Sequence, residues 1–256
     1  MQSMSEQPIL ETQQLTKCFG ALRAVDGVDI AFQPQKITLI IGPNGSGKTT
    51  LLNCIAGLYK PDEGRVMYKG EDITARPPHE IVRKGLVRTF QTPMPLAKLT
   101  VLENLLVGFQ GHRGEKLTRC LFKGSWLGQE REAVEKARDI LALLGLDHMW
   151  NRLSEELSGG QLKLLEIGKT LMANAQVILA DEPVGSVNPV LAHDLFGHVA
   201  NLTQQLGITF VMIEHRLQIA TGYADYVYAM MDGKIVSQGD ADHVLSDAKV
   251  IEGYLR

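Results

Sequence analysis

Short apolar runs bounded by glycine and proline alternate along this chain with longer segments in which apolar residues recur every three or four positions. Residues 36–42 (KITLIIG) and 176–183 (QVILADEP) hold uninterrupted apolar stretches, which are typical of strands buried on both faces of a sheet. Residues 49–58, 157–173 and 189–207 carry the helical period instead. This alternation predicts an α/β fold with a mainly parallel sheet and helices on its faces.

Two parts of different character are predicted around this core. Residues 8–20 and 25–32 are rich in β-branched residues and alternate partly, which indicates strands. Residues 100–109 and 131–146 are helix-like without a strand pattern between them, so we expect an inserted helical subdomain. Residues 226–239 predict a hairpin, which a short helix follows. Further predicted strands are residues 64–73, 86–90 and 208–215, and a further predicted helix is 77–85.

The length of 256 residues allows one large domain or two small ones. We expect a single domain over residues 1–256, in which residues 8–91 and 158–256 form the α/β core with its antiparallel part. Residues 92–157 are expected to form the helical subdomain.

Composition excludes some classes of function. The 26 basic and 29 acidic residues give a net charge of -3 without a long block of one sign, so we expect no nucleic-acid partner. Three scattered cysteines, Cys18, Cys54 and Cys120, suit a reducing compartment. No apolar run approaches the roughly 20 residues of a membrane-spanning helix, so work at a membrane would require a partner.

Residues 42–49 (GPNGSGKT) lie between a predicted buried strand and a predicted helix, and they match G-x-x-x-x-G-K-[ST]. Glycines let the backbone curl so that successive N–H groups point at phosphate oxygens, and the helix adds its positive N-terminal end. Lys48 would reach the β- and γ-phosphates, and the Thr49 hydroxyl would bind Mg²⁺. The flanking strand and helix disfavour the alternative, a glycine-rich turn with an exposed lysine. We therefore expect a nucleoside triphosphate to bind here.

Two neighbouring carboxylates, Asp181 and Glu182, follow the apolar run of residues 177–180. Open α/β sheets bind ligands at the carboxyl ends of their strands. Because side chains alternate in direction along a strand, the two carboxylates can serve different partners. We expect Asp181 in the Mg²⁺ shell and Glu182 beside the water that attacks the γ-phosphate. From the strand pattern alone, a pair of exposed acidic residues in a turn would be an equally good interpretation. The phosphate-binding loop predicted at residues 42–49 (the phosphate loop) disfavours that alternative.

A second glycine motif, LSGGQ at residues 157–161, opens a predicted helix. Alone it is a weak signal, because Ser158 followed by glycines is also an ordinary helix N-cap. Together with GPNGSGKT upstream and ILADEP one helix downstream, it resembles the ATP-binding cassette (ABC) ATPases over nearly the whole chain. The resemblance implies a P-loop NTPase core of the RecA-like type, an N-terminal antiparallel β subdomain and an inserted helical subdomain.

The same resemblance assigns roles to residues that carry no signal of their own. Gln91 resembles the family's Q-loop glutamine and His215 its switch histidine, whereas Phe19 stands where an aromatic residue, more often tyrosine, stacks on adenine. The alternatives are a polar loop residue, a strand-end histidine and a core phenylalanine. The expected catalytic residues are Glu182, His215, Gln91 and Lys48, and the expected metal ligands are Thr49, Gln91 and Asp181. The expected nucleotide-binding residues are Phe19, Gly42, Pro43, Asn44, Gly45, Ser46, Gly47, Lys48, Thr49, Thr50, Ser158, Gly159, Gly160 and Gln161.

Family architecture implies head-to-tail dimers, in which LSGGQ of one subunit closes on the ATP held by GPNGSGKT of the other. Expected partners are a second ABC ATPase subunit, identical or different, two transmembrane permease subunits and, indirectly, an extracytoplasmic solute-binding protein. The expected cofactors are ATP and Mg²⁺, and the expected location is the cytoplasmic face of the cell membrane. Gln91 and the helical subdomain would carry the motion of the dimer to the permeases.

Four stretches narrow the resemblance to one branch: VRTFQ, the long insert after ENLLV, GSVNP after DEP, and VIEGYLR at the end. They resemble the ATPases of branched-chain amino-acid importers. Importer ATPases for urea or short amides, and ATPases of lipopolysaccharide export, remain alternatives; the export proteins usually lack the insert and keep Asp at the position of Asn188. A DNA-repair or chromosome-clamp head would need a long coiled coil, which the pattern lacks.

Two features are left with open roles. The insert mixes basic with apolar residues, and we weigh a solvated loop equally against a contact with anionic lipid or the permease. Asn188 stands in a loop that crosses to the partner subunit in the family, and its amide can still donate and accept hydrogen bonds there. The basic residues of the insert are His112, Arg113, Lys116, Arg119 and Lys123.

Overall fold

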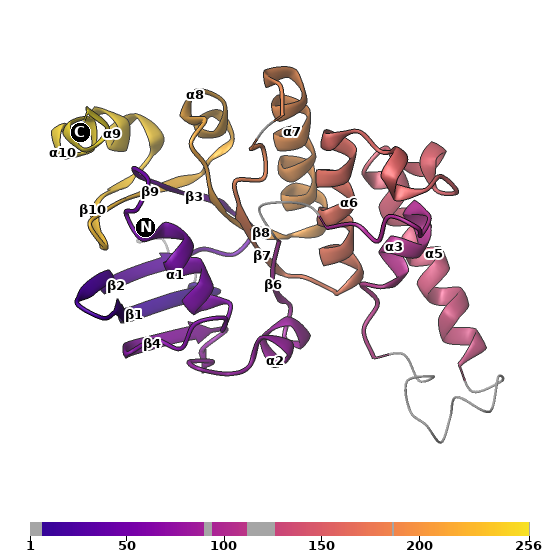
Figure 1. The fold of residues 1–256 in the computed structure, drawn as a ribbon, viewed down its shortest axis with the longest axis horizontal. Helices are drawn as coiled ribbons and strands as arrows, with labels where there is room; N and C mark the ends of the chain where they lie inside the picture. Colours follow the sequence, from indigo (N-terminus) through magenta and orange to yellow (C-terminus); the bar gives the residue numbers. More distant parts are fainter. Residues whose placement is uncertain (1–6, 90–93, 112–125, 186, 256) are drawn as a thin grey trace, which may run out of the picture. The chain divides into compact units, whose positions relative to one another are not determined.

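The computed structural model describes residues 7–89, 94–111, 126–185 and 187–255 of the chain. Two compact units divide the chain. The first comprises Met1–Gln91 and Gln176–Arg256, and the second comprises Thr92–Ala175. Figure 1 traces both along the sequence.

A six-stranded sheet with the order β10-β9-β3-β8-β7-β6 forms the base of the first unit. All neighbouring strands are parallel except the β9–β10 hairpin, which confirms the predicted mainly parallel sheet. Every residue of β3, β7 and β8 is buried, as their uninterrupted apolar runs predict. The strands are β3 (Ile37–Ile41), β6 (Leu86–Arg88), β7 (Val177–Asp181), β8 (Thr209–Ile213), β9 (Tyr226–Met231) and β10 (Lys234–Gly239).

An antiparallel sheet of order β2-β1-β4-β5 completes the strands of this unit and confirms the predicted antiparallel part. Residues 64–73, predicted as one strand, form two strands because the chain turns at Lys69 and Gly70, which both have positive φ (52° and 75°). The strands are β1 (Leu10–Phe19), β2 (Leu22–Phe32), β4 (Glu63–Tyr68) and β5 (Glu71–Asp72).

One hydrophobic core joins the two sheets through α1 (Lys48–Ile55), whose Leu51, Leu52 and Ile55 are fully buried in it. Alternate residues of β7, β8 and β9 face this core, for example Val211 of β8. Phe210, its neighbour, is buried outside that cluster, as the period of two requires. The opposite face of the sheet is in contact with α7 (Pro189–Leu206), which packs on β8. The loop at residues 42–47 therefore connects a fully buried strand, β3, with a helix that is buried in the core, α1.

The shorter helices differ from the prediction at two places. α2 (Pro78–Arg83) begins with a proline in its first turn, as predicted, whereas α8 (Leu217–Ala220), which follows β8, was not predicted. The single closing helix predicted from the sequence is instead two, α9 (Ala241–Ser246) and α10 (Ala248–Leu255). Asp247 separates them because its backbone is extended (φ -65°, ψ 124°).

The second unit is helical. α3 (Val101–Leu106), α5 (Leu127–Leu143) and α6 (Gly159–Met172) pack on one another, with short 3₁₀ turns at Asp147–Met149 and Ser154–Glu156. A Cβ atom added at Gly168 of α6 would lie 2.7 Å from the Leu105 side chain, so this glycine permits close packing. Because α6 packs here, the unit extends to Ala175, beyond the boundary at residue 157 that the sequence predicts.

Several sequence features lie outside the described residues: Gln91, the basic residues of the insert and Cys120. Cys18 and Cys54, which are described, are free thiols. No helix in the described part of the chain combines the length and apolar character needed to cross a bilayer.

Candidate nucleotide site

The loop from Gly42 to Gly47 curls between β3 and α1, and two of its glycines are required by their surroundings. Gly42 and Gly47 have φ values of 149° and 102°, which disfavour any residue with a Cβ atom. A Cβ at Gly42 would lie 2.1 Å from the Met230 carbonyl oxygen, and one at Gly47 would lie 2.0 Å from that of Ala24. The backbones of β9 and β2 thus leave no room for a side chain at either position. This explains why the motif has glycine at both of these places.

Lys48, the first residue of α1, is 5% exposed and its ammonium group folds back over the loop. Nζ donates to the carbonyl oxygens of Gly42 and Pro43, each at 2.9 Å, and to the Ser46 hydroxyl at 3.3 Å. Burial lowers the pKa of Lys48, while the negative charges of Asp181 and Glu182 oppose that shift. A buried ammonium at the start of a helix that follows a glycine-rich loop is suited to binding phosphate oxygens.

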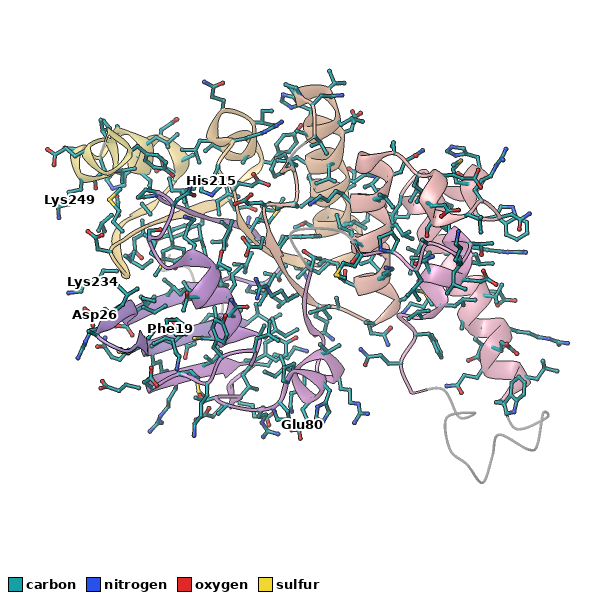
Figure 2. All side chains as sticks on the ribbon, in the orientation of Figure 1. Phe19, Asp26, Glu80, His215, Lys234 and Lys249 are labelled. Atoms are coloured by element: carbon teal, nitrogen blue, oxygen red, sulfur yellow. The ribbon has the colours of Figure 1, made fainter. Side chains whose placement is uncertain are left out.

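A cavity of about 300 Å³ opens beside this loop and brings together nine of the predicted site residues. Phe19 enters from the antiparallel sheet, and His215 enters from the segment after β8 (Figure 2). Of the predicted residues in the first unit, Gly42, Pro43, Ser46 and Asp181 lie outside the lining. The predicted residues of the LSGGQ motif (Ser158, Gly159, Gly160 and Gln161) belong to the second unit and do not line it either. The cavity is lined by Phe19, Leu22, Ala24, Asn44, Gly45, Gly47, Lys48, Thr49, Thr50, Glu182, Ile213 and His215.

Phe19 is 46% exposed at the edge of the cavity, so it is not a core residue. Its ring meets that of Tyr59 edge to face, with centroids 5.5 Å apart. Leu22, which the sequence analysis missed, pairs with Phe19 across the β1–β2 turn and is 66% exposed. The two-residue loop at Gly20 is a recognisable hairpin signal that would have placed these two side chains together. An exposed apolar pair of this kind suits the face of a planar base.

Asp181 ends β7, and its carboxylate is almost fully buried. Nη2 of Arg88, on the neighbouring strand β6, lies 3.0 Å from its Oδ2 atom. Nη1 of Arg88 also bonds to Asn53 of α1, whereas its buried Nε finds no hydrogen-bond partner among the described residues. Sequence reasoning missed Arg88, because only the sheet order brings β6 beside β7.

Glu182 takes a different environment from its neighbour Asp181. Its backbone has φ of 51°, and its N–H donates to the Ile213 carbonyl at 2.9 Å, which turns the chain away from the strand. Its Oε1 atom lies 3.1 Å from Nε2 of His215, and both side chains are about one third exposed in the cavity. Two adjacent carboxylates therefore face two different surroundings, one buried against Arg88 and the other open beside His215.

The family model described as "ABC transporter" matches residues 25–185 of this chain. This chain belongs to the ABC transporter family. The cassette is an ATPase, and its cavity beside the phosphate loop has the features of an ATP site.

Relatives of known name are similar over almost their full length. The cassette is 48% identical to the probable branched-chain amino acid transport ATP-binding protein LivG of Archaeoglobus fulgidus, covering 96% of this chain and 95% of that protein. It is 50% identical to the protein of the same name in Methanocaldococcus jannaschii (96% and 97% covered). The LivG protein of Escherichia coli K12, described as high-affinity, is 33% identical (97% and 98%).

Solved structures with the same fold include two at 50% identity. One is a crystal structure of a nucleotide-free ATP-binding cassette from an ABC transporter, with a TM-score of 0.85. The other is the ADP conformation of an ATP-binding cassette, with a TM-score of 0.86. Each comparison covers 97% of this chain and 99% of that chain, so the expected P-loop NTPase fold is confirmed.

Glu214 and Arg216, the two neighbours of His215, form hydrogen bonds that link the segment after β8 to the loop after Glu182. Glu214 is 1% exposed, and its Oε1 atom accepts a hydrogen bond from the Val184 N–H at 2.9 Å. Burial raises the pKa of Glu214 to about 7, against the effect of backbone N–H groups that stabilise its charge. The Arg216 guanidinium donates to the Val187 carbonyl oxygen. Sequence reasoning singled out neither residue.

The LSGGQ motif (residues 157–161), here called the signature motif, lies in the helical unit of the cassette. Ser158 is the N-cap of α6: its hydroxyl accepts from the Gln161 N–H at 3.4 Å, and the Gln161 side chain accepts from the Ser158 N–H at 2.9 Å. The two form a capping box, which the sequence left open as an alternative. The motif opens a 14-residue helix on two glycines, Gly159 exposed and Gly160 buried.

Asn188 is also a cap. Its Oδ1 atom accepts from the Leu191 N–H at 2.9 Å, which makes it the N-cap of α7. The oxygen of the amide that we expected at a dimer interface is thus bonded within the chain.

Proposed function

We propose that this cassette hydrolyses ATP in the cavity beside the phosphate loop, and that this drives the uptake of branched-chain amino acids. It would act with a second cassette and two transmembrane permease subunits at the cytoplasmic face of the membrane. The solute class is supported by the LivG relatives at 48–50% identity over almost the full chain. The hydrolytic role rests on one observation above all, the Glu182–His215 pair beside the phosphate loop.

Hydrolysis of the γ-phosphate depends mainly on positioning and on the stabilisation of charge. Lys48 supplies a positive charge at the loop, and the backbone N–H groups at the start of α1 supply further hydrogen bonds. Glu182 accepts a proton from the attacking water as the water oxygen bonds to the γ-phosphorus and the bond to the leaving ADP oxygen breaks. His215 holds the Glu182 carboxylate from the other side.

The residues present suit a magnesium ion that takes its remaining ligands from phosphate and water oxygens. Thr49 offers a hydroxyl in the cavity, and Asp181 offers a buried carboxylate at the end of β7. Mg²⁺ would supply charge neutralisation between the phosphate groups. Arg88 keeps the Asp181 carboxylate in a fixed orientation through its 3.0 Å ion pair.

The signature motif would complete the ATP site of a second cassette in a head-to-tail dimer. The first backbone N–H groups of an α-helix have no partner within the helix, and the N-terminus of α6 carries a partial positive charge; both features suit a phosphate. Gly159 is exposed with no atom within 4 Å of an added Cβ, so nothing in the described chain shields this N-terminus there. One chain would hold two half-sites.

Replacing Glu182 with Gln tests the hydrolytic role. We expect ATP binding to be retained, turnover to be nearly lost and an ATP-dependent dimer to accumulate, measured by nucleotide binding, phosphate release and sedimentation. Glu135→Gln, at an exposed position of α5, is the matched control and should hydrolyse ATP normally. Normal turnover of Glu182→Gln would refute the assigned role.

The solute is tested by purifying the cassette with its permeases in liposomes and measuring ATP hydrolysis with the solute-binding protein. Leucine, isoleucine and valine should stimulate hydrolysis. Stimulation by urea or a short amide alone, or by lipopolysaccharide, would favour the alternative transporters and contradict amino-acid import.

A further inference from the structure

Helix α10 is seated against the hairpin that borders the phosphate loop. It packs on β10 and α9, and Val250 is its buried anchor (Figure 1). A Cβ atom added at Gly253 would lie 2.2 Å from the end of the Met231 side chain, so this glycine lets the helix approach the end of β9 closely. The next residue, Tyr254, is thereby directed at the start of the loop.

The Tyr254 hydroxyl accepts a hydrogen bond of 2.8 Å from the Gly42 N–H, although the two residues are 212 positions apart. Tyr254 is 39% exposed, and burial raises its pKa against the opposing effect of the Gly42 N–H. Gly42 also meets the Met230 carbonyl, and its own carbonyl oxygen accepts from Lys48. Gly42, the first residue of the loop, therefore contacts Met230, Lys48 and Tyr254. The contact with Tyr254 comes from α10.

Gly42 has a φ of 149°, which glycine can adopt. Because glycine can also adopt many other values, contacts with other residues are needed to keep this conformation. The pairing of β3 with β9 ends at Ile41, and the Gly42 N–H donates to the Tyr254 hydroxyl. Without the hydroxyl, this N–H would lose its partner and the loop would sample other orientations before phosphate binds.

We propose that Tyr254 is a positioning residue of the phosphate loop, through which α10 sets the affinity of the cassette for ATP. The inference rests on the proposed binding of ATP phosphates by the loop. Tyr254 is not among the residues that line the cavity; it acts through the orientation of Gly42, whose carbonyl oxygen accepts from the Lys48 ammonium.

Tyr254→Phe removes only the hydroxyl and keeps the ring. One lost hydrogen bond predicts that the Kd for ATP and the KM rise about fivefold while kcat changes less than about twofold. The amide hydrogen of Gly42 should also exchange faster with solvent in this variant. Tyr226→Phe, a hydroxyl deletion at the other end of β9, is the matched control and should leave the Kd and the Gly42 exchange unchanged.

The outcomes separate this inference from the proposed site. Loss of ATP binding in Lys48→Ala supports the loop as the phosphate site. If Lys48→Ala binds ATP as the unaltered chain does, the proposed site itself is wrong. If Lys48→Ala loses ATP but Tyr254→Phe keeps both its Kd and its Gly42 exchange rate, only the role of Tyr254 is overturned. A fall in kcat with an unchanged KM would indicate a merely structural contact and would also overturn it.

Discussion

Nε2 of His215 lies 3.1 Å from Oε1 of Glu182, although the two residues follow different strands, β8 and β7. β7 and β8 are parallel neighbours with Asp181 opposite Ile213, so the segments that follow this pair emerge side by side. The Glu182 N–H bonds to the Ile213 carbonyl and fixes the distance between the two segments. The pair is thus a product of strand register rather than of a flexible loop.

Because Glu182 and His215 are in contact, we expect them to act as one unit. Glu182→Gln and His215→Ala should each lower kcat by roughly 10²–10³-fold. The double variant should lose no more than about tenfold beyond the worse single variant, since effects within a unit are not additive. Steady-state phosphate release measures all three. Losses that multiply would mean that the two residues act independently.

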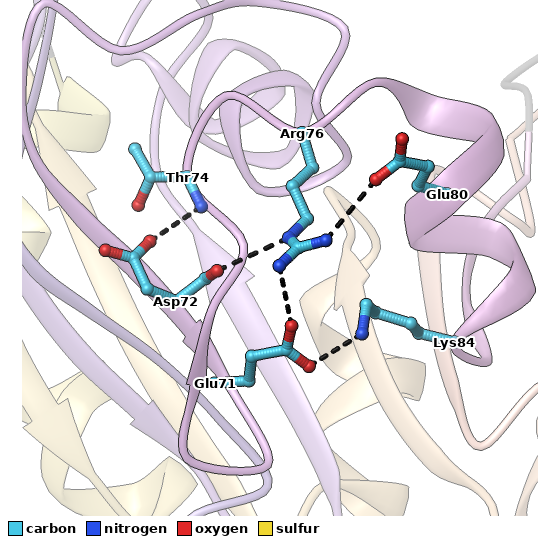
Figure 3. Close-up of polar contacts among 6 residues, drawn as sticks. All are labelled: Glu71, Asp72, Thr74, Arg76, Glu80 and Lys84. Atoms are coloured by element: carbon cyan, nitrogen blue, oxygen red, sulfur yellow. Dashed lines mark hydrogen bonds and ion pairs between the residues drawn. The ribbon is translucent and has the colours of Figure 1, made fainter.

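Arg88 and Arg76 offer a comparison of a buried with an exposed ion pair. Arg88–Asp181 is buried, with side-chain exposures of 13% and 4%. Arg76 joins Glu71 and Glu80 in an exposed network that Lys84 completes (Figure 3). Arg88→Met should lower the free energy of unfolding by about 3 kcal/mol, because the Asp181 carboxylate is left buried and uncompensated.

Arg76→Met is the control and should cost less than about 1 kcal/mol, because its partners remain solvated. Urea denaturation without nucleotide measures both variants. Equal losses would show that burial does not distinguish the two arginines.

Glu214 should make the stability of the fold depend on pH near neutrality. Its pKa rises from 4.5 to about 7 on folding, so the folded chain binds more protons between these values and its stability falls as pH rises through them. The shift corresponds to roughly 3 kcal/mol. Glu214→Gln removes this dependence, so its stability relative to the unaltered chain should increase by about that amount between pH 4.5 and pH 8.

The pH series is measured by urea denaturation at fixed ionic strength. Glu80→Gln, at a residue of α2 whose side chain is 43% exposed, serves as the control and should show no comparable change with pH. A difference between Glu214→Gln and the unaltered chain that stays constant with pH would contradict the raised pKa.

Asn188 should matter first as the cap of α7. Asn188→Ala is expected to lower the free energy of unfolding by about 1 kcal/mol, whereas Asn188→Asp should stay within about 0.5 kcal/mol, because a carboxylate also caps well. Thermal unfolding measures both. The same pair of variants tests coupling between ATP sites: unchanged cooperativity of hydrolysis in Asn188→Asp would count against a role for the missing charge.

Much of the architecture could be predicted locally. The buried strands β3 and β7, the helix after the phosphate loop and the β9–β10 hairpin were each recognisable from apolar runs and turn residues. Boundaries were less secure: α5 begins at Leu127 rather than at residue 131, and the closing helix is divided at Asp247. Helix ends depend on capping contacts, which the hydrophobic period does not report.

By itself, the sequence determined the phosphate loop, the two carboxylates and the class of fold, because each is specified by residues that are neighbours along the chain. Only the tertiary structure decided which distant groups complete the site. Arg88 reaches Asp181 because β6 pairs with β7, and Tyr254 reaches Gly42 because α10 packs beside β9. Such contacts arise from the order of strands and the seating of helices, and a local pattern of polar and apolar residues carries no information about either.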